Sequence, residues 1–268
     1  MLMTRSFPEI EHFLSEYAGL NPAAVPGMVG RAVERMLTQR NLDDASEYLQ
    51  LMKSSQKEFD SLLEEVLVPE TWFFRYPEAY QYLQRWALTR IQEEATTRQR
   101  KLRILSVPCS SGEEPYSIAI ALLEAGLRSE QFQIDAADIS HTALEKAKIG
   151  RYSQNSFRGP GQHYKHRHFV KESGNYQLNT NILELVRFFL WNVLEPPPSQ
   201  VKSSYDVIFC RNLFIYFHPA AQKKMIAVLK RLLDSRGLLF AGHAEAGPLL
   251  SPAFHALAPM KAFVHGKR

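Results

Sequence analysis

The residues best suited to chemistry in this chain form the segment SSGEEP at 110–115. Gly112 permits a tight turn and the close approach of a ligand. Glu113 and Glu114 follow at the predicted start of a helix, where backbone N–H groups commonly bind phosphate. Two carboxylates repel a phosphate, so the loop disfavours NAD, FAD and nucleoside triphosphates. S-adenosyl-L-methionine fits better, because it carries an ammonium and a sulfonium and no phosphate.

Polar residues also stand where other predicted strands end. Asp138 follows Gly112 by 26 residues, at the position from which an acidic residue binds ribose hydroxyls. Asn192 ends a later strand, and Arg211 and Asn212 end the next. The carboxyl ends of parallel strands meet at one edge of a sheet, so these side chains are expected in one ligand site.

The elements that must position these residues fall into two groups. Residues 8–91 repeat apolar residues at helical spacing, with Pro or Asn-Asp between segments, and predict a small helical domain within 1–91. From Leu102 strands and helices alternate, which predicts an α/β, Rossmann-like domain of the class I methyltransferase type over 92–268, with a parallel sheet. The stretch 151–184 interrupts that alternation and predicts a small antiparallel β insertion.

Individual elements can also be predicted. Ser111 and Glu114 have the spacing of a capping box at the first helix of the α/β domain. Within the α/β domain we expect strands at 101–107, 131–138, 186–193, 205–210 and 237–245, and helices at 114–127, 141–150 and 219–237.

The composition is that of a folded globular protein, with 45% hydrophobic and 22% charged residues among 268. No apolar run is long enough to cross a bilayer and the first residues lack a signal-peptide pattern, so no membrane insertion and a cytoplasmic location are expected. Two cysteines fit a reducing compartment. The net charge is +4, but residues 1–90 hold nine Lys/Arg against thirteen Asp/Glu, which does not favour a nucleic acid partner.

Four motifs in order give a resemblance to a known family. The segments TWFFR (71–75), SVPCSSGEEPYSIAIAL (106–122), FCRNLFIYF (209–217) and GLLFAGHAE (237–245) resemble the CheR family of chemotaxis receptor methyltransferases. The resemblance runs from about residue 10 to the end. It implies an S-adenosyl-L-methionine-dependent protein-glutamate O-methyltransferase, without a metal, that releases S-adenosyl-L-homocysteine.

The resemblance also implies roles for single residues. Thr71 and Arg75 would reach the cofactor and the methyl-transfer site, and Tyr216 would lie at the reaction centre. Glu113 would hold the amino-acid end of the cofactor and Asp138 its ribose. The remaining cofactor contacts would be Gly112, Asn192, Val193, Arg211 and Asn212. Pro69 stands where many members have Asn, so one polar contact is in doubt.

The partner implied by the resemblance is the cytoplasmic coiled coil of a methyl-accepting receptor. Arg31 and Arg35, one helical turn apart, with Arg40 beyond them, predict a basic docking face for that acidic rod. The turn KESGN at 171–175 is short, which favours no binding of a C-terminal receptor pentapeptide. PETWFFR is similar to members that continue into a helical-repeat domain, so the chain is expected to be a catalytic portion of a longer protein.

Two other functions stay open at this point. A nucleic-acid methyltransferase fits the pI of about 9.0, although the Asn/Asp-Pro-Pro-aromatic tetrapeptide of amino-methylating enzymes is missing. A non-catalytic adaptor that binds the adenosyl ligand is the second alternative. The histidines of HYKHRH (163–168) are expected to form a solvated basic surface, since no coherent metal ligand set accompanies them.

Overall fold

A computed structural model describes residues 5–24, 26–66, 70–95, 100–159, 161–201, 204–245, 250, 252–257 and 263–268. Pro69, at which the sequence departs from the family pattern, lies outside the described residues.

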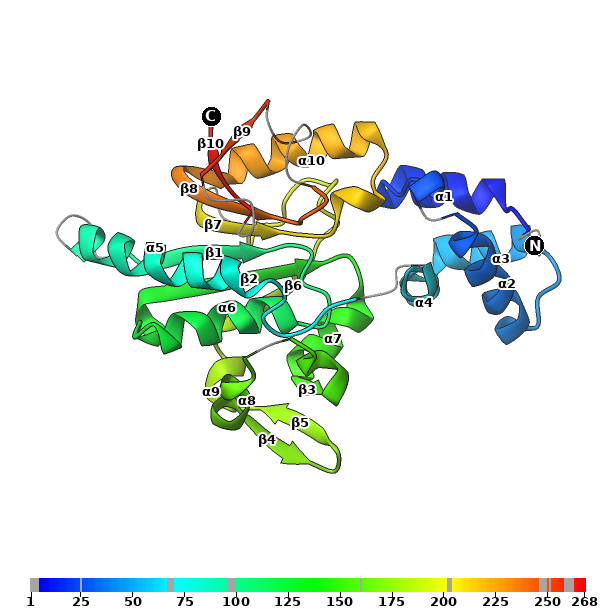
Figure 1. The fold of residues 1–268 in the computed structure, drawn as a ribbon. Coiled ribbons are helices and arrows are strands. Elements are labelled where there is room, and N and C mark those ends of the chain that lie inside the picture. Colours follow the sequence, from blue (N-terminus) through cyan, green and yellow to red (C-terminus); the bar gives the residue numbers. More distant parts are fainter. Residues whose placement is uncertain are drawn as a thin grey trace.

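The predicted N-terminal helices are present as α1 (Pro8–Ala18), α2 (Met28–Arg40), α3 (Ala45–Ser54) and α4 (Gln56–Val66). Buried apolar residues recur every three or four positions, as at Val29, Val33 and Met36 of α2. The Asp44 side chain caps α3 by accepting a 2.8 Å hydrogen bond from the Ser46 N–H. These helices enclose a hydrophobic core of their own and form the blue lobe of Figure 1, which we call the helical module.

Seven strands of the described chain form one sheet. In spatial order they are β6 (Val186–Leu190), β2 (Phe132–Asp138), β1 (Leu102–Ser106), β7 (Tyr205–Cys210), β8 (Leu233–Ala241), β10 (Val264–Lys267) and β9 (Phe254–Ala256). The first five are parallel, but β10 is antiparallel to β8 and β9. The sheet is therefore mixed and not wholly parallel, because β10 runs in the direction opposite to that of both its neighbours. The strand order reverses between β1 and β7, where open α/β sheets bind ligands.

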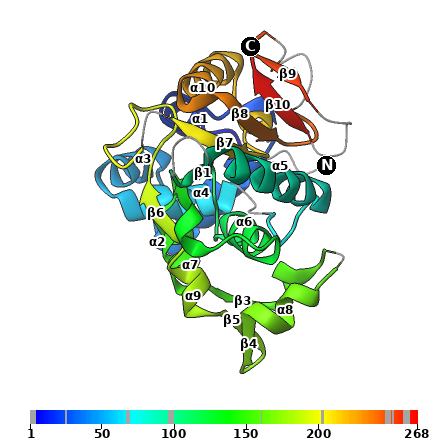
Figure 2. The same ribbon diagram turned by 90° about the vertical axis from the view of Figure 1, so that its left-hand side faces the viewer.

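Helices cover both faces of this sheet (Figure 2). Alternate strand residues such as Ile104 and Phe209 pack with α5 (Pro77–Ala95), α6 (Glu113–Glu124) and α7 (His141–Ile149). The residues between them, such as Leu105 and Ile208, pack with α10 (Pro219–Leu232) on the other face. This alternation is the two-residue period of strands buried on both sides, and it confirms the expected α/β architecture with helices on both faces of the sheet.

Several predicted boundaries differ from the structure. The strands expected at 186–193 and 237–245 end at Leu190 and Ala241. The last helix was expected to reach residue 237 but ends at Leu232, and Leu233 already begins β8. Tyr80 and Leu83 of α5 pack in the core of the sheet and not in that of the helical module. α5 thus packs with the sheet, although it lies in the range expected for the helical domain.

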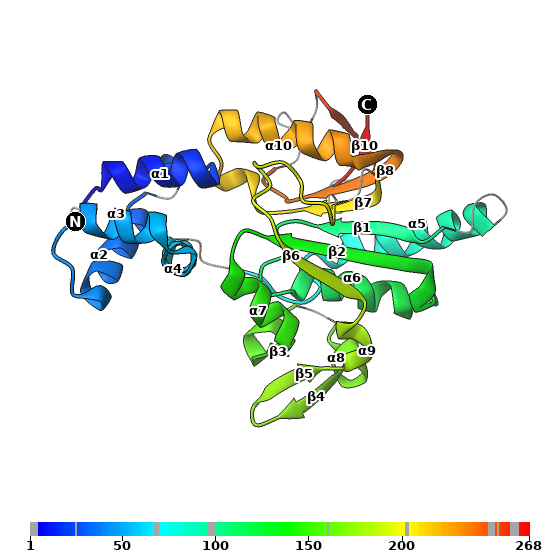
Figure 3. The ribbon, with the colours of Figure 1, turned by 180° about the vertical axis from the view of Figure 1, so that it is seen from behind.

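The predicted β insertion is a second sheet of three antiparallel strands, in the order β3 (Arg151–Tyr152), β5 (Asn175–Leu178) and β4 (Phe169–Glu172). Figure 3 shows it below the main sheet. The HYKHRH segment forms α8 (His163–His168), and it is not wholly solvated: Lys165 is buried, and its ammonium lies 3.7 Å from the centre of the Tyr176 ring. None of the described helices combines the length and apolar character that a bilayer crossing needs.

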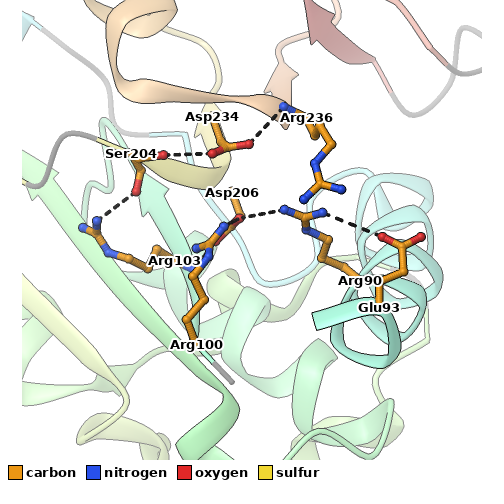
Figure 4. A network of polar contacts seen from close by, with 8 residues as sticks. All are labelled: Arg90, Glu93, Arg100, Arg103, Ser204, Asp206, Asp234 and Arg236. Carbon is orange, nitrogen blue, oxygen red and sulfur yellow. Dashed lines mark hydrogen bonds and ion pairs between the residues drawn. The ribbon is translucent and has the colours of Figure 1, made fainter. Parts of the chain in front are cut away.

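A polar network ties α5 to the sheet near the amino end of β7, away from the strand ends that carry the predicted site (Figure 4). The buried Asp206 carboxylate accepts hydrogen bonds of 2.8 and 2.6 Å from Arg100 and one of 2.9 Å from the Arg103 N–H. Arg90 of α5 lies 3.8 Å from the same carboxylate. The network pairs positive with negative side chains, and we assign it a structural role.

Candidate functional site

The loop after β1 brings a glycine and two carboxylates to the start of α6. Gly112 has φ +94°, and a Cβ there would lie 3.0 Å from Tyr116 and from the Tyr152 hydroxyl, so a side chain is excluded. The predicted capping box is wrong. Gly112 itself is the N-cap residue, Ser111 Oγ donates to Glu113, and Glu114 accepts a 2.8 Å hydrogen bond from Ser106 Oγ.

Glu113 is 3% exposed and is held between two hydroxyl groups. Its carboxylate accepts hydrogen bonds of 2.7 Å from Ser111 Oγ and 3.0 Å from Ser156 Oγ. Burial raises the pKa of Glu113, and these two hydrogen bonds act in the opposite direction. Sequence reasoning missed Ser156, because it lies in the insertion 43 residues away and no local pattern marks it.

Asp138 ends β2 as predicted and is fixed by backbone groups. Its carboxylate accepts hydrogen bonds of 2.8 Å from the Ser110 N–H and 3.0 Å from the Ser140 N–H. Burial raises its pKa, and these backbone hydrogen bonds lower it. The side chain is thus held in place before any ligand binds.

A pocket lies at the point where the strand order reverses, with about 470 Å³ of space that is partly open to solvent. Four predicted site residues line it: Asp138, Asn192, Val193 and Tyr216. Its wall also includes Ala18, Leu20 and Leu63 of the helical module, which sequence reasoning did not assign to the site.

Asn192 connects the pocket wall to the end of α1. Its side-chain Nδ2 donates a 2.6 Å hydrogen bond to the Tyr17 carbonyl, and its Oδ1 accepts one of 3.0 Å from the Leu194 N–H. Both polar atoms of this predicted cofactor residue therefore have protein partners.

The helical module also pairs with the segment that carries Tyr216. The Asn21 N–H donates a 2.7 Å hydrogen bond to the Tyr216 carbonyl, and the His218 N–H donates one of 3.0 Å to the Gly19 carbonyl. Leu20 and Phe217 form an antiparallel bridge between these hydrogen bonds. The position of Tyr216 thus depends on the module as well as on the sheet.

Arg75 and Arg211 form a second group, beside the pocket lining. Arg211 Nη2 donates to the Arg75 carbonyl at 2.7 Å, and Arg211 Nη1 lies 3.4 Å from Glu114. The Arg75 guanidinium lies 4.4 Å from the centre of the Trp72 ring and hydrogen bonds to the Glu70 carbonyl. Arg75 Nε is buried without a hydrogen-bond partner among the described residues.

The structure thus distributes the predicted site residues over adjoining groups. Burial raises the pKa of the Tyr216 phenol, and the charge of Arg75 acts in the opposite direction. Thr71, Arg75, Gly112, Glu113, Arg211 and Asn212 do not belong to the described lining of the pocket.

The predicted docking arginines differ in their surroundings. Arg35 pairs with Glu65 at 2.6 Å, and Arg40 pairs with Glu58 at 2.9 Å. Arg31 is exposed on the same helix. The face is therefore less basic than its sequence indicates.

The residues present fit S-adenosyl-L-methionine. Buried carboxylates at Glu113 and Asp138 suit an ammonium and ribose hydroxyls, while Glu113 and Glu114 at the start of α6 oppose a phosphate. No group of three or more His, Cys, Asp or Glu side chains that could hold a metal ion occurs in the described part of the chain.

Comparisons with known proteins identify relatives over most of the chain. Residues 69–259 match the family model described as CheR methyltransferase, SAM binding domain. The probable biofilm formation methyltransferases WspC of Pseudomonas aeruginosa and Pseudomonas putida are 43% and 38% identical over 251 and 254 residues, which cover 93% and 94% of this chain. The chain spans only 58% and 59% of the length of these two relatives. Chemotaxis protein methyltransferase 2 of Vibrio cholerae is 35% identical over 206 residues, which cover 76% of this chain and 71% of that protein.

Proposed function

Because the chain belongs to the CheR methyltransferase family, we propose that it transfers a methyl group to glutamate side chains of a chemoreceptor-like signalling protein. The products are glutamyl methyl esters and S-adenosyl-L-homocysteine. The observation that carries the proposal is the match over 69–259, a range that includes Asp138, Asn192, Val193 and Tyr216 of the pocket lining.

Two buried carboxylates would bind S-adenosyl-L-methionine, which when bound supplies a methyl group on a sulfonium. Glu113 would accept the ammonium and Asp138 the ribose hydroxyls, both from positions fixed by hydrogen bonds. The other residues proposed for cofactor binding are Thr71, Arg75, Gly112, Asn192, Val193, Arg211 and Asn212.

The residues of the chain need to orient the substrate rather than activate it. A glutamate side chain has a pKa of about 4.3 and is ionised at neutral pH, so it requires no general base. Arg75 and Tyr216 would orient this carboxylate and exclude water from it. The buried Arg75 Nε donates to no acceptor among the described residues, and Tyr216 lines the pocket. Both observations support these roles.

Labelled methyl transfer to the cytoplasmic fragment of a receptor tests this function. We expect incorporation that is released by base, as from a methyl ester, and a rate reduced about a hundredfold by Arg75→Ala and less by Tyr216→Phe. Wild-type rates for both variants would remove these two roles. Incorporation into nucleic acid, or cofactor binding without any transfer, would replace the function by one of the alternatives, which no observation here favours.

The substrate partner would be the coiled-coil domain of the receptor, bound at Arg31, Arg35 and Arg40. Substitution of Arg31 tests this surface most directly, because Arg31 is exposed, whereas Arg35 and Arg40 already pair with glutamates. Arg31→Glu should raise the KM for the receptor and leave the affinity for S-adenosyl-L-homocysteine unchanged. Arg128→Glu, an exposed charge reversal after α6, is the matched control. Equal KM values for both variants would remove this docking face.

The β insertion is proposed to work without a pentapeptide tether. Glu172 pairs with Asn175, so only Ser173 and Gly174 connect β4 to β5. A peptide of the receptor C-terminus should give no measurable heat of binding, and saturable binding would contradict this proposal. The family resemblance supports two further proposals, that the protein acts in the cytoplasm and that its full length includes a helical-repeat domain.

A further inference from the structure

The Glu245 carboxylate lies under the loop between β7 and α10. It is 2% exposed and accepts three backbone hydrogen bonds: 2.8 Å from the Asn212 N–H, 2.7 Å from the Phe214 N–H and 2.8 Å from the Gly242 N–H. Burial raises the pKa of Glu245, and the backbone donors lower it. The fold thus keeps an acidic side chain in its interior and surrounds it with main-chain donors.

This arrangement stabilises a loop conformation that is unfavourable by itself. Asn212 has φ +60°, in the left-handed region that a non-glycine residue adopts at some cost. A buried N–H without an acceptor costs about 1–3 kcal/mol, so one carboxylate that accepts three of them holds the loop tightly.

The loop carries residues of the proposed site at both ends. Arg211, which hydrogen bonds to the Arg75 carbonyl, immediately precedes Asn212. Tyr216 follows Phe214 by two residues, and its carbonyl is bound by the Asn21 N–H. The loop is therefore anchored by Glu245 on the side of the sheet and by the helical module beyond Tyr216.

The close approach requires Gly242. A Cβ at this position would overlap Glu245 Oε2 and lie 3.0 Å from the Asn212 nitrogen. Gly242→Ala would therefore disturb the same contact without a change of charge.

We infer that Glu245 is a positioning residue that acts on substrate through Tyr216, by fixing the loop 211–216. Glu245 itself does not line the pocket, and its hydrogen-bond donors in the described chain are backbone N–H groups. The inference rests on the proposed function for the role of Tyr216, whereas the hold on the loop can be measured without any activity.

Hydrogen exchange measures that hold directly. Glu245→Gln replaces one acceptor oxygen by an NH₂ group that faces N–H donors, so amide exchange in 211–217 should rise about tenfold or more. Asp135→Asn is the matched control, because Asp135 is 1% exposed and bonds to Tyr205 and Arg187, neither of which belongs to the loop 211–216. It should leave exchange in 211–217 unchanged. Equal exchange in both variants would overturn the inference.

A double-mutant cycle tests the action through Tyr216. Glu245→Gln should lower kcat about tenfold in the wild type and change it less than about twofold in the Tyr216→Phe background. A residue that only stabilises the fold would give independent effects that multiply, and that result would also overturn the inference. If Glu245→Gln does not fold, Gly242→Ala gives the same two measurements. If the wild type transfers no methyl group, the proposed function fails, and hydrogen exchange alone decides whether Glu245 holds the loop.

Discussion

Arg211 Nη2 donates a 2.7 Å hydrogen bond to the backbone carbonyl of Arg75, 136 residues away in the chain. The Arg211 side chain is 3% exposed, and its guanidinium also lies 3.4 Å from Glu114 and 4.8 Å from the centre of the Tyr76 ring. The segment before α5 is therefore fixed against the carboxyl end of β7. This contact gives Arg211 a role in positioning that segment, in addition to the cofactor contact proposed for it.

Removal of Arg211 should be costly, because it takes the cation away from Glu114, whose side chain is only 14% exposed. We expect Arg211→Ala to lower the free energy of unfolding by about 3 kcal/mol, in the range for a broken buried pair. Arg211→Lys should lose less of the free energy of unfolding, because Lys keeps the charge although it lacks the planar guanidinium group. Urea denaturation measures both variants. Arg35→Ala is the control: its ion pair is exposed and should contribute less than about 1 kcal/mol. Equal losses for Arg211→Ala and Arg35→Ala would contradict the expectation.

Asn192 offers a test of the link between the helical module and the pocket. Asn192→Ala removes the hydrogen bonds to the Tyr17 carbonyl and the Leu194 N–H. The free energy of unfolding should fall by about 1–2 kcal/mol, and S-adenosyl-L-homocysteine should bind more weakly in titration calorimetry. Asn179→Ala removes a single hydrogen bond to the Arg167 carbonyl in the insertion. It should leave the affinity unchanged, and a loss of affinity in this control would show that the effect is not local to the pocket.

The sequence predicted the residues that depend on periodicity and strand ends. Asp138, Asn192 and Arg211 stand at the ends of β2, β6 and β7 because alternating strands and helices determine that edge of the sheet. Contacts made through tertiary folding had no local signal. Ser156 reaches Glu113 from the insertion, and Leu63 reaches the pocket from the helical module, so neither could be found from spacing.

The basic face of α2 and the role of Glu245 were also hard to predict, because both depend on contacts between distant parts of the chain. The pairs Arg35 with Glu65 and Arg40 with Glu58 join different helices, so the sequence of α2 alone overstated the basic face. Glu245 follows β8 in the segment GLLFAGHAE, and its role depends on a hydrogen bond from Asn212, 33 residues earlier in the chain.

Gly19 allows a steric test of the same contact between the helical module and the pocket. It has φ +69°, and a Cβ would lie 2.5 Å from Leu194 Cδ1 and 2.8 Å from Ala221 Cβ. Gly126 has φ +94° with no atom within 4 Å of its added Cβ, so Gly126→Ala carries only the backbone cost of about 1–2 kcal/mol. We expect Gly19→Ala to lose about 1–3 kcal/mol more and to weaken binding of S-adenosyl-L-homocysteine. Equal melting temperatures for the two variants would show that the helical module shifts to accept the Cβ of residue 19 without a loss of stability.

The affinity for S-adenosyl-L-homocysteine at acidic pH should depend on Glu113. Burial raises its pKa above the ordinary value of 4.5 in the free protein. The carboxyl must be ionised to bind an ammonium, so affinity for S-adenosyl-L-homocysteine should be complete above this raised pKa and fall as the pH falls through it. The stability of the free protein should change in the opposite sense. The folded state binds this proton more tightly, so the contribution of Glu113 to stability is present below pH 4.5 and is lost as the pH rises through the raised pKa.

Calorimetry between pH 5 and 8 separates Glu113 from its neighbour in this response. Burial raises the pKa of Asp138 as well, so both carboxylates should contribute to the loss of affinity in acid. Glu113→Gln should weaken binding at pH 8 and flatten the profile, leaving the part that belongs to Asp138. Asp138→Asn should leave the part that belongs to Glu113. A Glu113→Gln profile that runs parallel to the wild type would mean that Glu113 does not meet the ammonium, and the amino-acid end of the cofactor would then need another acceptor.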